Sequence, residues 1–146
     1  MYEVWIDATV LIHKTAKDPG FNLEVKLFRE NYTSPDKLIF EVEPSKDGYL
    51  TVFVLSDEES GQIYPNALEP QEKLLANKSY SFPKSLALDY EVTSEKPIEI
   101  NYLVILYTKQ EIPFQEDQNS ANILRFIAEI APDQKCINTY SILIKR

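Results

Sequence analysis

The fold is decided by the stretch Tyr49-Leu50-Thr51-Val52-Phe53-Val54-Leu55, a nearly continuous apolar run. Its β-branched and aromatic side chains favour a strand over a helix. A strand that is apolar on both sides is typical of a sheet covered on both faces. The residues just before it, Lys46-Asp47-Gly48, are a strong turn signal. We therefore predict that residues 49–55 form the central strand of a buried sheet.

Further strands are predicted on both sides of this run, because apolar and polar residues alternate between proline- and glycine-containing turns. They cover residues 4–13, 21–27, 38–43, 62–64, 79–82, 86–92, 98–108 and 138–145. The first two are expected to pair as a hairpin across the turn residues 17–20. Residues 79–82 and 86–92 read as edge strands, and residues 67–78 as a long surface loop in which a short helical turn is possible.

One helix is predicted near the C-terminus. Ser120 is the expected N-cap, and Pro132 stops the helix soon after its end. The apolar positions recur at helical spacing, namely Ile123, Phe126, Ile127 and Ile130. The predicted fold class is all-β, a mostly antiparallel β-sandwich, Ig-like or similar, with this C-terminal α-helix packed on the sheet. We expect residues 1–146 to form a single domain cut from a longer protein, since the strand pattern begins almost at the first residue.

Composition restricts the partners. The formal net charge is -8 and the pI is near 4.7, so the net field repels a phosphate backbone and nucleic acid is not an expected partner. No apolar run approaches the roughly 20 residues that span a bilayer, and no signal peptide pattern precedes the first strand, so no direct membrane insertion is expected. The single cysteine, Cys136, excludes an intrachain disulfide and is expected to be buried.

The residues that catalysis commonly uses are scarce. His13 is the only histidine and has no nucleophile signature near it, and one cysteine with one histidine is too small a set for a usual zinc site. The acidic residues at 57–59 and 116–117 lack the spacing of a calcium loop, and no glycine-rich loop could hold a phosphate. We expect no cofactor and no enzymatic activity, although an enzyme that uses only carboxylates stays open because sequence cannot reveal a cleft.

Several segments together resemble a known family. They are Lys46-Asp47-Gly48-Tyr49 with the strand that follows, Ile63-Tyr64-Pro65-Asn66, Phe82-Pro83 and Leu103-Val104-Ile105. In residue type and spacing they are similar to the DUF4384 family, bacterial β-rich domains of unknown function, over about residues 37–114. The resemblance implies one domain of a larger bacterial protein, such as the envelope lipoproteins of Bacteroidetes, and hence a location in the periplasm or cell envelope.

The shared residues have a structural and a functional interpretation. In the structural one, Gly48 takes a positive φ in the turn, and Asn66 bonds nearby backbone after Pro65 ends a strand. In the functional one, Tyr64, Pro65 and Asn66 are part of a binding surface for a ligand or partner. The structural interpretation is favoured, because turn chemistry accounts for these residues locally.

The function expected from these observations is that of a non-catalytic accessory or interaction domain. Its partner would be another protein or a neighbouring domain of the same polypeptide. The alternative is a module that binds a small ligand or a glycan, because exposed aromatic rings on a sheet can stack on sugars. The candidate rings for stacking are Trp5, Tyr80, Tyr90 and Tyr107; strand packing is the simpler explanation for them.

Overall fold

The structure is a computed structural model that describes residues 16–27, 29, 31–34, 36–56, 60–84, 90–92 and 96–145. The strand predicted at residues 4–13, its hairpin, His13 and Trp5 lie outside the described residues. The turn predicted at 17–20 is present, with the N–H of Phe21 donating to the carbonyl of Asp18 at 3.2 Å.

The larger sheet is built around the two most apolar strands of the sequence, β5 (Gly48–Leu55) and β10 (Ile98–Thr108). These two strands pair antiparallel, and β10 also pairs antiparallel with β11 (Lys135–Lys145). The sheet is completed by β2 (Asn31–Thr33), β6 (Gly61–Tyr64) and the short β7 (Lys73–Leu74), in the order β2-β11-β10-β5-β6, with β7 also on β5. β2 runs parallel to β11. The predicted central strand is therefore confirmed.

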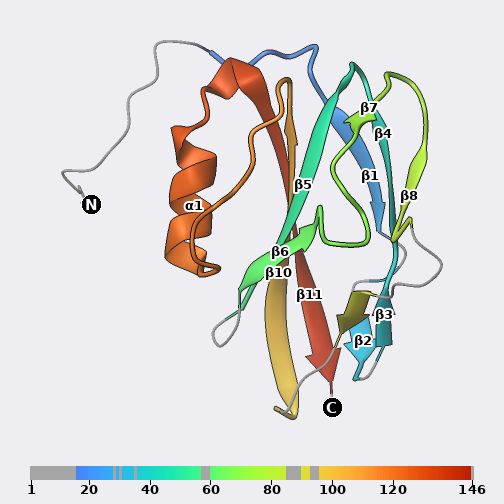
Figure 1. Cartoon of the computed structure of the whole chain (residues 1–146). Coiled ribbons are helices and arrows are strands. Elements are labelled where there is room, and N and C mark those ends of the chain that lie inside the picture. Colours follow the sequence, from blue (N-terminus) through green and yellow to red (C-terminus); the bar gives the residue numbers. More distant parts are fainter. Residues whose placement is uncertain are drawn as a thin grey trace.

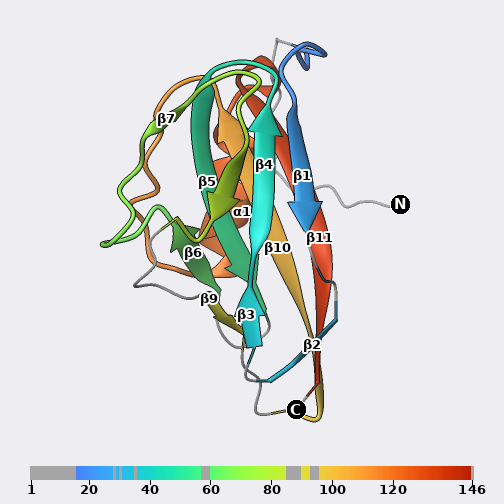
Figure 2. The same ribbon diagram turned by 90° about the vertical axis from the view of Figure 1, so that its right-hand side faces the viewer.

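A smaller sheet covers one face of the larger one (Figure 2). It contains β1 (Leu23–Leu27), β4 (Phe40–Pro44) and β8 (Tyr80–Phe82), with β8 at its edge as predicted. β3 (Asp36–Leu38) and β9 (Tyr90–Val92) pair separately. The one strand predicted at 38–43 is thus divided at Ile39, because its first part pairs with β9 and its second part with β1 and β8.

Alternation along β10 sends its side chains into two separate apolar layers. Leu103, Ile105 and Tyr107 join the inner core between the two sheets. Val104 and Leu106 point to the opposite face, where they join the helix core beneath α1 (Ser120–Glu129). The result is a β-rich fold of two facing sheets with one helix on the outer face of the larger sheet (Figure 1), which confirms the predicted class.

Most of the helix prediction is confirmed. Ile123, Ile127 and Ile130 are buried in the helix core, and Phe126 is half-buried at its border. The N-cap is one residue earlier than predicted: the side chain of Asn119 accepts from the N–H of Asn122 at 2.8 Å. A short 3₁₀ helix, Pro132–Gln134, follows and leads into β11. No helix among the described residues is long and apolar enough to cross a bilayer.

Two local predictions were wrong. Gly48 does not have a positive φ; it is required because a Cβ there would lie 2.7 Å from the backbone oxygen of Thr108 and 2.7 Å from the ring of Tyr107. The segment 67–78 is not simply a surface loop. It contains β7, which pairs with the start of β5, and it contributes the fully buried Leu74 to the inner core.

Candidate functional site

The corner Tyr64-Pro65-Asn66 lies where β6 leaves the larger sheet. The ring of Tyr64 is fully buried and meets the ring of Phe82 edge-on, at a centroid distance of 4.7 Å. Phe82 ends β8 of the smaller sheet, and both the Tyr64–Pro65 and Phe82–Pro83 peptide bonds are cis. Two of the motif segments recognised in the sequence are therefore in contact, although they belong to different sheets.

The amide of Asn66 is used within the corner itself. Its Nδ2 donates to the carbonyl of Ile63 and to Oε1 of Glu69, both at 2.9 Å. Its Oδ1 accepts from the N–H groups of Leu68 and Glu69, also both at 2.9 Å. These contacts confirm the predicted local bonding of Asn66, which holds residues 66–69 in a tight turn.

Glu69 is the residue that sequence reasoning missed. Its side chain is only 4% exposed, and its carboxylate accepts from the hydroxyl of Tyr90 at 2.6 Å and from the backbone N–H of Lys84. With the Asn66 contact, this carboxylate ties the corner after β6 to β9 and to the end of β8. A buried carboxylate needs such donors, because an unpaired charge is expensive to bury. The one sequence signal was the Asn66-x-x-Glu69 spacing, which is also that of a capping box.

Burial controls the ionisation of the two tyrosines in this corner. Burial, followed by the charge of Glu69, raises the pKa of Tyr64 to about 12. Burial, followed by the hydrogen bond to Glu69, also raises the pKa of Tyr90. Both hydroxyls therefore stay protonated at neutral pH, and Tyr90 acts as a donor. The hydroxyl of Tyr64 and Oε1 of Gln62 are buried without a hydrogen-bond partner among the described residues.

The aromatic rings considered for sugar stacking do not form an exposed platform among the described residues. Tyr90 and Tyr107 are buried, and the hydroxyl of Tyr107 donates to the carbonyl of Lys46 at 2.7 Å. Tyr80 is half-buried, and its ring has the ammonium groups of Lys78 and Lys84 at 5.4 Å each from its centroid. Tyr90 and Tyr107 therefore pack in the inner core, which confirms the favoured explanation by strand packing and removes both rings as candidates for stacking on a glycan.

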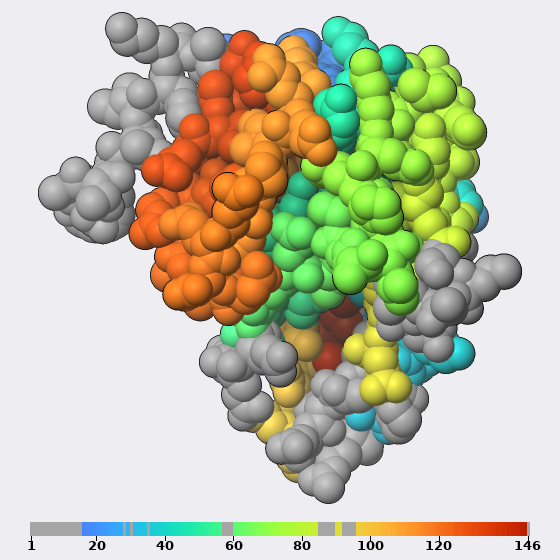
Figure 3. All heavy atoms as spheres, in the orientation of Figure 1, coloured from blue at the N-terminus to red at the C-terminus, as the bar shows by residue number. Residues whose placement is uncertain are grey.

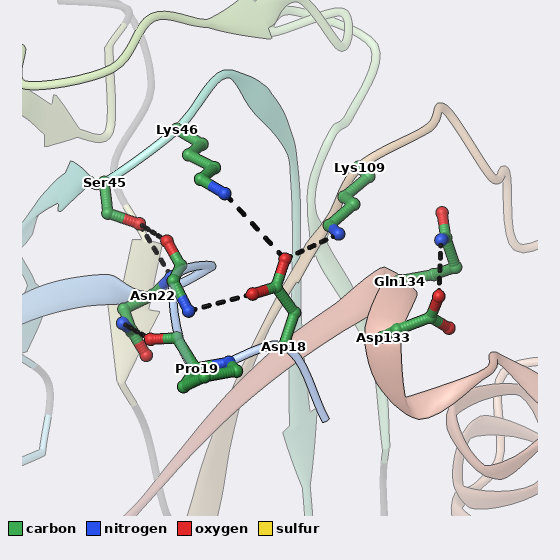
Figure 4. Close-up of polar contacts among 9 residues, drawn as sticks. Asp18, Pro19, Asn22, Ser45, Lys46, Lys109, Asp133 and Gln134 are labelled. Atoms are coloured by element: carbon green, nitrogen blue, oxygen red, sulfur yellow. Dashed lines mark hydrogen bonds and ion pairs between the residues drawn. The ribbon is translucent and has the colours of Figure 1, made fainter. Parts of the chain in front are cut away.

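A second polar group lies at the end of the sandwich where the described chain begins (Figure 4). The carboxylate of Asp18 accepts from Nζ of Lys109 at 2.8 Å and from the N–H of Gly20 at 2.9 Å, with Nζ of Lys46 at 3.9 Å. The hydrogen bond from Lys109 is the main cause that lowers the pKa of Asp18. The group fastens the turn before β1 to the end of β10, which is a structural role.

The other reactive residues are accounted for as follows. Cys136 is buried, as predicted. Glu116 pairs with Arg125 at 2.6 Å, and the acidic residues at 57–59 lie outside the described residues. In the part of the chain that the structure describes, no three histidine, cysteine or acidic side chains come together as metal ligands.

An apolar surface lies at the other end of β10. Ile98, Ile100 and Tyr102, which we call the β10 stripe, have exposed fractions of 60%, 53% and 48%. They alternate with polar residues and lie on the same face as Val104, which α1 covers. Figure 1 shows β10 continuing beyond the end of α1, and in Figure 3 part of its gold lower end is visible at the surface. The apolar pattern predicts this strand, but it does not predict that Ile98, Ile100 and Tyr102 would stay exposed beyond the part of β10 that α1 covers.

The comparisons with known proteins place the chain in a family. Among curated proteins, none matches this chain. A family model described as "Domain of unknown function (DUF4384)" matches residues 31–111, close to the range of 37–114 expected from the motifs. The matched range includes both proline corners, Glu69, Tyr90 and the β10 stripe, whereas α1 and β11 follow it. Because the match spans more than half of the chain, this protein belongs to the DUF4384 family of domains of unknown function.

Proposed function

We propose that this domain is a non-catalytic interaction domain of a larger bacterial cell-envelope protein, and that the β10 stripe is the surface it uses. The observation that carries the proposal is the stripe itself. Three successive side chains on one face of a strand are each about half exposed or more, and together they expose on the order of 300 Å². A patch of this size is within the range of the largest apolar patch on a typical monomeric protein, and such a patch often has a function.

The polar chemistry of the domain supports the same function. The Asn66 amide and the Glu69 carboxylate are engaged with one another and with Tyr90, and Asp18 is engaged with Lys109. In these described clusters the charged groups are held by internal partners. They are thus explained by folding, and a proton-transfer role is not needed to account for them.

Crosslinking in the native host tests the proposed surface. The photoreactive amino acid p-benzoylphenylalanine would replace Tyr102 in the full-length protein, and Leu124, which is 54% exposed on α1, would be the control position. We expect a discrete crosslinked product from position 102 only, and we expect Ile100→Glu to abolish it. Equal products from both positions, or none from position 102, would contradict the proposal.

Two further measurements test the rest of the proposal. Fractionation of host cells should place the full-length protein in the envelope; recovery in the cytoplasm would contradict that location. A broad hydrolase screen should show no turnover by the purified domain. Turnover that disappears when a single carboxylate is substituted would show that the domain is an enzyme.

A further inference from the structure

Resting on the proposed function, we infer that the β10 stripe binds an amphipathic helix of about ten residues whose apolar side is flanked by basic residues. The starting point is the way the same face is already covered. α1 lays Ile123 and Ile127 over Val104 and Leu106 of β10 and Phe53 of β5. The side chains of the β10 stripe lie on that same face, at every second residue from Tyr102 back to Ile98.

Among the described residues, the backbone of β10 is paired on both sides, with β5 and with β11, from Tyr102 to Thr108 and on the β11 side alone from Ile98 to Asn101. Over the stripe, Ile100 lies opposite Leu143, and Tyr102 lies opposite Ser141 and Leu55. A strand added beside residues 98–101 would lie in the plane of the sheet and leave the stripe side chains, which project from its face, largely exposed. A partner that covers the stripe must therefore bind on that face, which is the mode by which a helix packs on a sheet.

The dimensions of the stripe fit a helix. From Ile98 to Tyr102 the strand rises about 14 Å, which equals about two and a half helical turns. α1, with ten residues, is about 15 Å long. A second helix of the length of α1 would therefore cover the stripe, with apolar residues at positions i, i+3, i+4 and i+7.

Area and charge both argue against a second copy of this domain as the occupant. A stable dimer removes about 800 Å² from each partner, whereas the stripe offers on the order of 300 Å². Each copy also carries a formal charge of -8, so two copies repel each other. The same charge favours a partner with basic residues beside its apolar side. Because the area is small, we expect weak binding unless the helix is tethered, as in a neighbouring domain of the same polypeptide.

A peptide titration tests the inference. The probe is a synthetic peptide of about 14 residues made of Leu, Ala and Lys, with its leucines on one helical face. It would be added to the ¹⁵N-labelled domain while amide resonances are followed by NMR. We expect the resonances of residues 98–102 and Leu143 to shift, and Ile100→Glu to weaken the binding at least about tenfold, the loss of one central apolar contact. The matched control Leu124→Glu, also at an exposed apolar site, should bind as the unsubstituted domain does.

Two control peptides define what would overturn the inference. One has the same composition with its leucines distributed around the helix, and the other has Glu in place of Lys. Equal binding of the first would show nonspecific apolar contact, and equal binding of the second would refute the basic flanks. Failure of the Lys peptide to bind, or its binding equally well to Ile100→Glu, would refute the helix.

Sedimentation equilibrium of the domain alone distinguishes failure of the helix inference from failure of the proposed function. A monomer is expected. A dimer that Ile100→Glu abolishes would make the occupant a second copy and refute the helix, while the stripe would remain an interaction surface. The crosslinking at position 102 decides the proposed function independently of any peptide.

Discussion

The corner at residues 64–69 and the β10 stripe differ in how far their side chains are buried and bonded within the domain. In the corner, the groups that could recognise a ligand are turned inward: Glu69 is 4% exposed and accepts from Tyr90 and from the corner's own amide. In the stripe, the side chains offer mainly apolar contact, with the hydroxyl of Tyr102 as the one polar group, and Ile98 is 60% exposed. The difference shows that the residues most prominent in the sequence motif hold the fold together, whereas the proposed contact surface carries no distinctive motif.

The largest effect is expected from Glu69→Ala. The substitution leaves the Tyr90 hydroxyl, the Asn66 amide and the Lys84 N–H without their acceptor, so unfolding should become easier by about 3–5 kcal/mol. Denaturant unfolding measures the change. Glu72→Ala is the matched control, because Glu72 is exposed and forms a surface ion pair with Lys84; its effect should stay below about 1 kcal/mol. Similar losses from both variants would show that Glu69 does not hold the corner.

The helix-covered half of the sheet face gives the next largest effect. Ile123 is fully buried, so Ile123→Ala should destabilise the domain by about 3 kcal/mol. Phe126 is half-buried and meets the ring of Phe114 at 5.2 Å, so Phe126→Ala should cost less than a fully buried ring, about 2 kcal/mol. Leu124→Ala, on the exposed side of α1, should change stability by less than about 0.5 kcal/mol. Thermal or denaturant unfolding of the three variants ranks them, and an unchanged transition for Ile123→Ala would mean that α1 is not docked.

A smaller effect is expected from Asn66→Ala. The variant loses the turn bonds to Ile63, Leu68 and Glu69, which should destabilise the fold by about 0.5–2 kcal/mol. Crosslinking at position 102 should change only as far as folding does. If stability were unchanged while association was lost, the Tyr64-Pro65-Asn66 corner would be a recognition site. Asn31→Ala, at an exposed position of β2, is the control for the loss of an asparagine side chain outside the corner.

The comparison also shows what local sequence can and cannot encode. β10 was predicted to the residue, Ile98–Thr108, because alternation and apolarity are local properties of a strand. The role of Glu69 could not be predicted in the same way, since Tyr90 lies 21 residues away in the chain. Their meeting depends on where the separate β3–β9 pair lies relative to the larger sheet. Asn119 and Ser120 are both good capping residues, so sequence alone placed the helix start one residue late. The exposure of the stripe depends on where α1 ends over β10, which no residue of β10 specifies.

Ile100→Glu is expected to have a small effect on folding and the largest effect on association. Ile100 is 53% exposed, and its cross-strand neighbour Leu143 is half-buried, so Ile100→Glu should alter the free energy of unfolding by less than about 1 kcal/mol. Circular dichroism and denaturant unfolding of the purified variant measure this change. A loss of several kcal/mol would show that Ile100 supports the sheet itself, and the apolar stripe would then belong to the core and not to a contact surface. A stable variant that no longer crosslinks through position 102 would separate association from folding, which the corner variants cannot do because their residues hold the fold together.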